Sequence, residues 1–158
     1  MSIYRLYICG LLLFCNSTVF AIEDDLQKAT VIASHGIKVQ AERIKVAAEN
    51  LANEDSTSFQ PGGNPYQRKV LFTKNVFNKA LNTNVIIVKK VDVAKSPFIL
   101  KYNPHHPAAD LNGYVKYPNV SKEIEKADAS EAQRSYEANL SVIELSKNMM
   151  QRTIEAIK

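Results

Sequence analysis

The chain has 158 residues, the size of one domain, and 46% of them are hydrophobic. Charged residues make up 23%, the net charge is +4 at pH 7, and there is no tryptophan. This composition excludes a disordered chain and a membrane-spanning one.

The first 21 residues have the layout of a secretory signal peptide. Arg5 is their only charged residue, an apolar run follows at 6–14, and Ala21 places a small side chain before a cleavage point. We therefore expect an exported chain that begins at Ile22. The alternative is an uncleaved anchor, although the apolar run is shorter than the roughly 20 residues that a membrane span needs.

Both cysteines, Cys9 and Cys15, lie in this signal-like segment. The processed chain would contain none, which excludes a disulfide framework, a thiol nucleophile and a cysteine metal site. We expect packing, or contacts with neighbouring molecules, to hold the chain together.

Residues 24–53 are predicted to form a helix with a narrow apolar seam. Its two heptad positions hold Leu26, Ala33, Gln40 and Ala47, and Thr30, Ile37, Ile44 and Leu51. Gly36 weakens this helix by about 1 kcal/mol relative to alanine. Two alternatives stay open: the helix packs on its own domain, or it pairs with another terminal helix or another subunit. Asn50 and Asn53 share one face, as surface residues or as hydrogen-bonding partners of a neighbour.

Residues 59–120 contain all six prolines and are predicted to form a small antiparallel β region. Strands are expected at 66–73, 85–93 and 98–102, with a further candidate at 114–117, while 75–81 is ambiguous. This segment carries nine basic and two acidic groups, net +7, whereas 22–58 and 121–158 carry −3 and −1. The excess predicts a solvated basic face or one that meets an acidic subunit.

Residues 102–120 combine three prolines, three tyrosines and a glycine. This density predicts an extended, turning loop that leads into the last helix. The tyrosines either pack the turns or anchor an interface.

Residues 121–158 are predicted to form a second helix, capped by Asn119 or Ser121 and about 50 Å long. Tyr136, Ile143, Met150 and Ile157 recur every seven residues, with polar Asn139, Ser146 and Thr153 between them. Leu140 and Ile154 flank this stripe, and Val142 and Met149 widen it. A helix of this length exceeds what the middle segment can cover. The two terminal helices should therefore cover each other or neighbouring subunits.

No catalytic or cofactor-binding pattern is present. His105, His106 and Asp110 are the best candidates for metal ligands, but adjacent histidines on an extended chain point to opposite sides. There is no glycine-rich phosphate loop, and the lysines lack the aromatic interleaving of a nucleic-acid site. We expect a non-enzymatic protein with no cofactor, no metal, no small-molecule substrate and no nucleic-acid partner.

Three motifs resemble those of the flagellar rod and hook axial proteins. Residues 48–53 (AENLAN) resemble the end of the family's N-terminal helix, and 131–139 (EAQRSYEAN) with Met149 and Met150 resemble its C-terminal helix. Residues 65–69 (PYQRK), 96–98 (SPF) and the loop at 102–120 are similar to the proximal-rod proteins of the flagellar basal body. The loop residues that carry this similarity are Tyr102, Asn103, Pro104, His106, Pro107, Asp110, Gly113, Tyr114, Pro118 and Asn119.

The resemblance implies a structural subunit of the periplasmic rod, located in the bacterial flagellum basal body. Such subunits assemble helically, with copies of themselves and with other rod subunits, into the hollow driveshaft for motility. Membrane contact would be indirect unless the N-terminal segment stays uncleaved. The alternative is a periplasmic binding or adaptor protein that keeps the fold.

We therefore predict an α+β fold with two long terminal helices pairing in a coiled-coil-like layer. The expected organisation is a signal-like segment at 1–21, a helical rod-core domain from 22–58 and 121–158, and a small β-rich domain at 59–120. The residues expected at subunit interfaces are Asn50, Asn53, Ile37, Ile44, Leu51, Tyr136, Asn139, Ile143, Met150 and Ile157.

Overall fold

The computed structural model describes the backbone of residues 2–157 and the side chains of residues 25–156. Two long terminal helices flank a β-rich middle in the sequence, which confirms the predicted α+β class. The described elements are α1 (Ser2–Ala52), β1 (Lys69–Asn78), β2 (Thr83–Val93), β3 (Ile99–Tyr102), β4 (Tyr114–Tyr117) and α2 (Lys122–Ile157).

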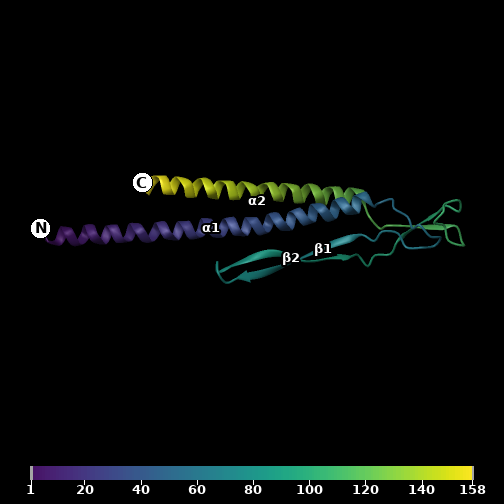
Figure 1. Cartoon of the computed structure of the whole chain (residues 1–158), viewed down its shortest axis with the longest axis horizontal. Helices are drawn as coiled ribbons and strands as arrows, with labels where there is room; N and C mark the ends of the chain where they lie inside the picture. The colour runs from purple at the N-terminus through teal and green to yellow at the C-terminus, as the bar shows by residue number, and fades with distance from the viewer. Residues whose placement is uncertain (1, 158) are drawn as a thin grey trace.

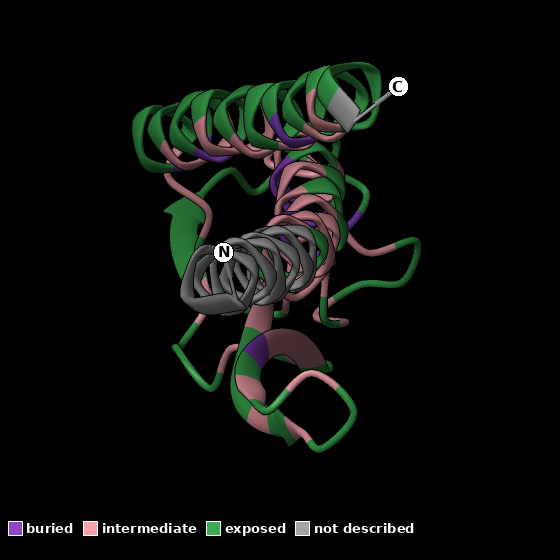
Figure 2. Ribbon diagram, turned by 90° about the vertical axis from the view of Figure 1, so that its left-hand side faces the viewer, coloured by how far each residue is buried: buried purple, intermediate pink, exposed green. Residues whose placement is uncertain are grey.

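Helix α1 is the central element of a long, thin molecule. It lies between α2 on one side and the β1–β2 hairpin on the other (Figures 1 and 2). The helices run antiparallel, so both chain ends lie at one end of the molecule and the loops around β3 and β4 at the other. A single helix therefore presents two packing faces.

The C-terminal end of α1 agrees with the sequence prediction to within one residue. The backbone N–H of Asn53 bonds to the carbonyl of Asn50 at 3.2 Å, and that of Glu54 to Leu51 at 3.3 Å, which tightens the last turn. The N-terminal end differs, because the helical backbone begins at Ser2 rather than residue 24. The side chains around the predicted cleavage point at Ala21 lie outside the described residues. Within the described residues, neither helix has a stretch long and apolar enough to span a membrane.

Strands β1 and β2 form an antiparallel hairpin, and β3 and β4 form a second, separate antiparallel pair. The register of the first hairpin shifts between Phe72 and Thr73, and β1 continues to Asn78. The ambiguous stretch at 75–81 is thus partly strand. Asn82, with a φ of 49°, occupies the left-handed region in the connecting turn, a conformation that asparagine tolerates.

The apolar core is small: most of it lies along α1, and Ala108 and Val115 are buried separately around the β3–β4 pair. Its buried members within the described residues are Ala33, Val39, Val46, Ala47, Val85, Ala108, Val115 and Ala132. The predicted single seam on α1 was therefore too narrow. Val39 and Val46 lie off that seam and are buried because the hairpin covers a second face of α1, beside the face that packs on α2.

Ser121, one of the two predicted cap residues, lies directly before the first residue of α2. Its carbonyl accepts the backbone N–H of Glu125 at 3.0 Å, and its hydroxyl donates to Glu123 at 3.2 Å. Acidic residues in this first turn favour the positive end of the helix dipole. The cap sets where α2 begins and so positions Glu125 against α1.

Candidate functional site

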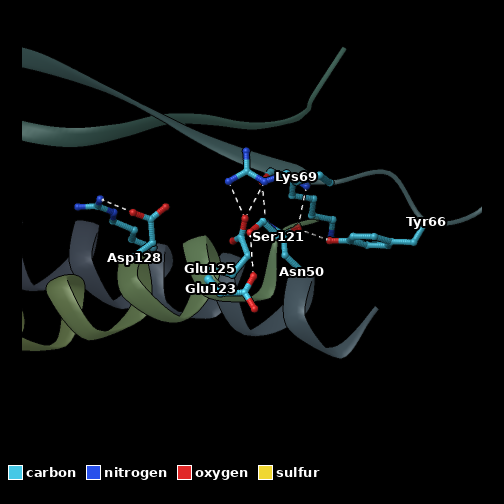
Figure 3. A network of polar contacts seen from close by, with 9 residues as sticks. Asn50, Tyr66, Lys69, Ser121, Glu123, Glu125 and Asp128 are labelled. Atoms are coloured by element: carbon cyan, nitrogen blue, oxygen red, sulfur yellow. Dashed lines mark hydrogen bonds and ion pairs between the residues drawn. The ribbon is translucent and has the colours of Figure 1, made fainter. Parts of the chain in front are cut away.

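A buried polar junction joins the end of α1, the start of β1 and the start of α2 (Figure 3). Asn50 is at its centre and is fully buried. Its Oδ1 accepts the Lys69 backbone N–H and the Tyr66 hydroxyl, each at 2.8 Å. Its Nδ2 donates to the Lys69 carbonyl and to Glu125 Oε2, each at 3.0 Å. All four hydrogen-bonding positions of this amide are therefore occupied.

The junction contains a charge that the solvent hardly reaches. The side chain of Glu125 is 2% exposed, and its Oε1 accepts Nε and a terminal nitrogen of Arg68, each at 2.6 Å. Arg68 is itself 28% exposed. A buried carboxylate is tolerated only when it is paired and hydrogen-bonded. Arg68 and Asn50 together meet that need.

Ion pairs lie next to the junction on its solvent-exposed side. Lys69 bonds to Glu49 at 2.8 Å, and this bond lowers the pKa of Glu49 and raises the pKa of Lys69. Burial raises the pKa of the Tyr66 hydroxyl. Lys122 reaches Glu54 at 2.5 Å and ties the start of α2 to the segment after α1. These pairs are partly exposed, so they contribute less than the buried pair.

A cavity of about 340 Å³ opens beside the junction, between α1, the hairpin and α2. Arg43 lies on its wall and is ion-paired with Asp128 at 3.3 Å and Glu131 at 3.8 Å. Gln40 Oε1 is buried there and has no hydrogen-bond partner among the described residues. Each charged group on this wall is ion-paired with a neighbouring side chain, which is the arrangement of a structural contact.

Further along the helix pair, Gly36 of α1 lies directly against the side chain of Asn139 of α2. A Cβ on Gly36 would lie 2.8 Å from Asn139 Oδ1. Asn139 in turn donates from Nδ2 to the Ser135 carbonyl at 2.8 Å. The glycine that weakens α1 as an isolated helix therefore makes room for a side chain of α2.

The residues predicted at subunit interfaces are buried or half-buried within the single chain, wherever their side chains are described. Asn50 is fully buried in the junction, and Asn53 is half-buried and donates to the Glu49 carbonyl at 2.8 Å. The others with described side chains are half-buried: Ile37, Ile44, Leu51, Tyr136, Asn139, Ile143 and Met150. The side chain of Ile157 lies outside the described residues.

The predicted loop is a set of consecutive turns. Asp110 Oδ1 accepts the backbone N–H groups of Asn112 at 2.8 Å and Tyr114 at 2.9 Å. Gly113 has a φ of 81°, a conformation that favours glycine, and a Cβ there would lie 2.9 Å from the ring of Tyr102. The rings of Tyr102 and Tyr114 pack edge to face, with their centroids 5.4 Å apart. The loop is held by its own backbone and aromatic contacts.

The remaining predicted loop residues support the same turns. The Asn103 carbonyl accepts from the backbone N–H of His106 at 3.2 Å, and His106 Nδ1 accepts from that of Ala108 at 3.1 Å. Pro118 is buried, whereas Pro104, Pro107 and Asn119 are exposed. In the part of the chain that the structure describes, no group of three or more histidine, cysteine or acidic residues could hold a metal ion.

Sequence reasoning missed two parts of this site. The pairing of Glu125 with Arg68 was not predicted. Arg68 was noted only within the predicted strand 66–73 and the PYQRK motif, and a glutamate in a first helical turn is an ordinary surface residue. The exposed apolar residues of α2 were only partly recognised. Val142 and Met149 were expected to widen the inward stripe, yet they are exposed together with Leu145.

Comparison with known proteins gives the family. A family model described as flagellar basal body rod FlgEFG protein C-terminal matches residues 111–156. The flagellar basal-body rod protein FlgC of Agrobacterium fabrum is 42% identical over 135 residues, which are 85% of this chain and 97% of that protein. FlgC of Salmonella typhimurium is 39% identical over 78% of this chain and 91% of its own length. FlgC of Borreliella burgdorferi is 36% identical over 80% and 94%.

Identity at this level extends over nearly the whole length of such relatives. The resemblance seen in the sequence motifs is thereby confirmed. The chain belongs to the FlgC family of flagellar basal-body rod proteins and is a structural component of the basal body of the bacterial flagellum.

Proposed function

We propose that this chain assembles helically, with copies of itself and with other flagellar rod subunits, into the hollow driveshaft that crosses the periplasm. It transmits torque and performs no catalysis. The proposal involves no cofactor, no small-molecule substrate and no nucleic acid.

One observation carries the proposal. Seventeen large apolar side chains are exposed among the described residues, whereas eight apolar residues are buried and four of those are alanines. Single exposed apolar residues are ordinary, but an excess over the core is typical of a surface made for association. A thin chain with this distribution gains its stability from neighbouring subunits.

The helical and β-rich parts of the chain have different roles in the proposed rod. The helices of 22–58 and 121–158 form the rod-core layer, and 59–120 forms the outer layer. Contacts between subunits use the outward edges of the helix seam, next to the half-buried residues Ile37, Tyr136 and Ile143. The first 21 residues are removed at export, because their sequence has the layout of a secretory signal peptide.

The experiment is to fractionate the cells that make the protein and to find its N-terminal residue by mass spectrometry. An Ile22 start in purified basal bodies is the expected result. Recovery in soluble periplasm alone, without any rod subunit, would refute the rod role and support the adaptor alternative. A deletion strain should lack rods and should not swim, and motility should return with the intact gene.

A further inference from the structure

The loop at 102–120 contains the one asparagine of this sequence that is followed by glycine, the pair Asn112–Gly113. Asn112 is exposed to solvent. An asparagine in this position can lose its side-chain ammonia without an enzyme, because glycine has no side chain to hinder attack by its backbone nitrogen. Asparagine is one of the thermolabile residues of proteins. The pair is therefore a candidate site of spontaneous modification.

The reaction consists of a ring closure and a hydrolysis. The Gly113 backbone nitrogen gives up its proton and attacks Cγ of Asn112. The side-chain nitrogen takes up that proton through water and leaves as ammonia. Water then opens the five-membered imide at one of its two carbonyl groups. One opening leaves an ordinary aspartate, and the other leaves isoaspartate, whose main chain is longer by one carbon atom. Water is the only other reactant, and its oxygen enters the new carboxylate.

Ring closure requires a particular backbone conformation at Asn112. The five-membered ring is nearly planar, so Cβ of Asn112 has to eclipse the Gly113 nitrogen across the Cα–C bond. The backbone nitrogen of Asn112 is bonded to the same tetrahedral Cα as Cβ, so it then lies about a third of a turn away from the eclipsed position. The ψ angle of Asn112 must therefore be far from zero when the ring closes.

The folded loop holds Asn112 in a different conformation. Residues 110–113 form a β-turn, in which the Gly113 N–H donates to the Asp110 carbonyl at 3.0 Å. A turn of type II, I′ or II′ would need a positive φ at Leu111 or Asn112, and neither residue has one. The turn is therefore of type I, in which ψ of the third residue is close to zero. The reacting atoms are thus held apart.

Asp110 keeps this turn closed with both its side chain and its backbone. Its Oδ1 accepts the backbone N–H groups of Asn112 at 2.8 Å and Tyr114 at 2.9 Å, and its own N–H donates to the Tyr114 carbonyl at 2.9 Å. On the far side of the turn, the Gly113 carbonyl accepts the Asn103 N–H at 2.9 Å. Rotating ψ of Asn112 into the reactive range displaces the Gly113 peptide and breaks these bonds.

We propose that Asn112–Gly113 is a deamidation site that the folded loop protects through Asp110 and that reacts when the loop opens. The proposal does not depend on the proposed rod function. The modified position lies directly before β4, where Tyr114 pairs with Tyr102 and the next residue of the strand is fully buried. Isoaspartate lengthens the main chain there, so a chain that has reacted cannot restore the same β3–β4 pairing.

The first test compares the folded and the unfolded wild-type chain. The purified full chain is incubated at mildly alkaline pH with and without denaturing urea, and peptide mass spectrometry follows the conversion of Asn112 to aspartate and isoaspartate. We expect the reaction to be faster in urea by at least about tenfold, because the native turn opens only transiently. Asn119 is the internal control, since it is also exposed but is followed by valine, and it should stay unmodified. Equal rates at Asn112 in both conditions, or no reaction in urea, would overturn the proposal.

The second test assigns the protection to Asp110. Asp110→Ala removes the acceptor of two backbone N–H groups and should speed the reaction of the folded chain by about tenfold. Asp110→Asn is the matched control, because it keeps an acceptor oxygen in the same place and should react at nearly the wild-type rate.

Circular dichroism and a repeat in urea separate the loop from the fold as a whole. The helix signal of both variants should equal that of wild type, and in urea all three chains should react at one rate. An Asp110→Ala chain that reacts no faster than wild type when folded, or one that is also faster in urea, refutes the role of Asp110.

Discussion

Replacing Glu125 by alanine tests the buried junction, because it removes the acceptor of two other groups at once. Arg68 loses its carboxylate, and Asn50 Nδ2 loses one of its two acceptors. Removing one partner of a buried ion pair costs about 3–5 kcal/mol. Arg68 is 28% exposed and regains part of its hydration, so we expect about 2–3 kcal/mol here. For a chain of this size that lowers Tm by about 5–10 °C.

Thermal unfolding followed by circular dichroism measures this change, with Glu123→Ala as the matched control. Glu123 lies two residues earlier in the same helical turn and is exposed, so its loss should change Tm only slightly. Arg68→Ala should destabilise the fold too, and the double variant should lose less than the sum of the two. A Glu125→Ala effect no larger than that of Glu123→Ala, or strict additivity with Arg68→Ala, would refute the argument.

The remaining predictions concern the helix contact, the pH response and the loop. Gly36→Ala should lower Tm, although alanine is the better helix former, because the new Cβ meets Asn139, and Asn139→Ala should restore it. Glu49 has a folded pKa below its ordinary 4.5, so its ion pair stabilises the fold above that pH and the contribution disappears as the pH falls through the folded pKa. Glu49→Gln should accordingly differ from wild type in urea unfolding at pH 7 but not at strongly acidic pH. Gly113→Ala should lower Tm, because a φ of 81° is strained for alanine and its Cβ would meet the Tyr102 ring. For the loop, an unchanged Tm is the result that contradicts the reasoning.

Features set by local chemistry could be predicted from the sequence. The end of α1, strand β2 and the cap at Ser121 all follow from neighbouring residues, and the structure has them within two residues of the predicted positions. The loop at 102–120 could also be located, because prolines and a glycine restrict its backbone locally. Periodicity further indicated that both terminal helices bury one face.

Features set by contacts between distant segments could not be predicted from the sequence. Val39 and Val46 are buried because the hairpin folds back onto a second face of α1. The periodicity within α1 does not predict that the hairpin packs there. Glu125 is buried because Arg68, 57 residues earlier, arrives beside it. Secondary-structure patterns describe which side of an element is apolar but not how many partners that element has.

The junction and the Gly36–Asn139 contact together fix how the helices align. Asn50 meets Glu125, and Gly36 meets Asn139, so the two contacts are 14 residues apart on α1 and 14 residues apart on α2. The seam between them is rich in alanine and half-buried polar residues, and small side chains alone specify register weakly. Sliding the helices by seven residues would separate Glu125 from Asn50 and bring Asn139 against Ala29 or Arg43 in place of Gly36. Such a slide leaves a buried carboxylate short of partners and places a larger side chain against Asn139, so polar groups in this seam select one alignment where apolar packing would allow several.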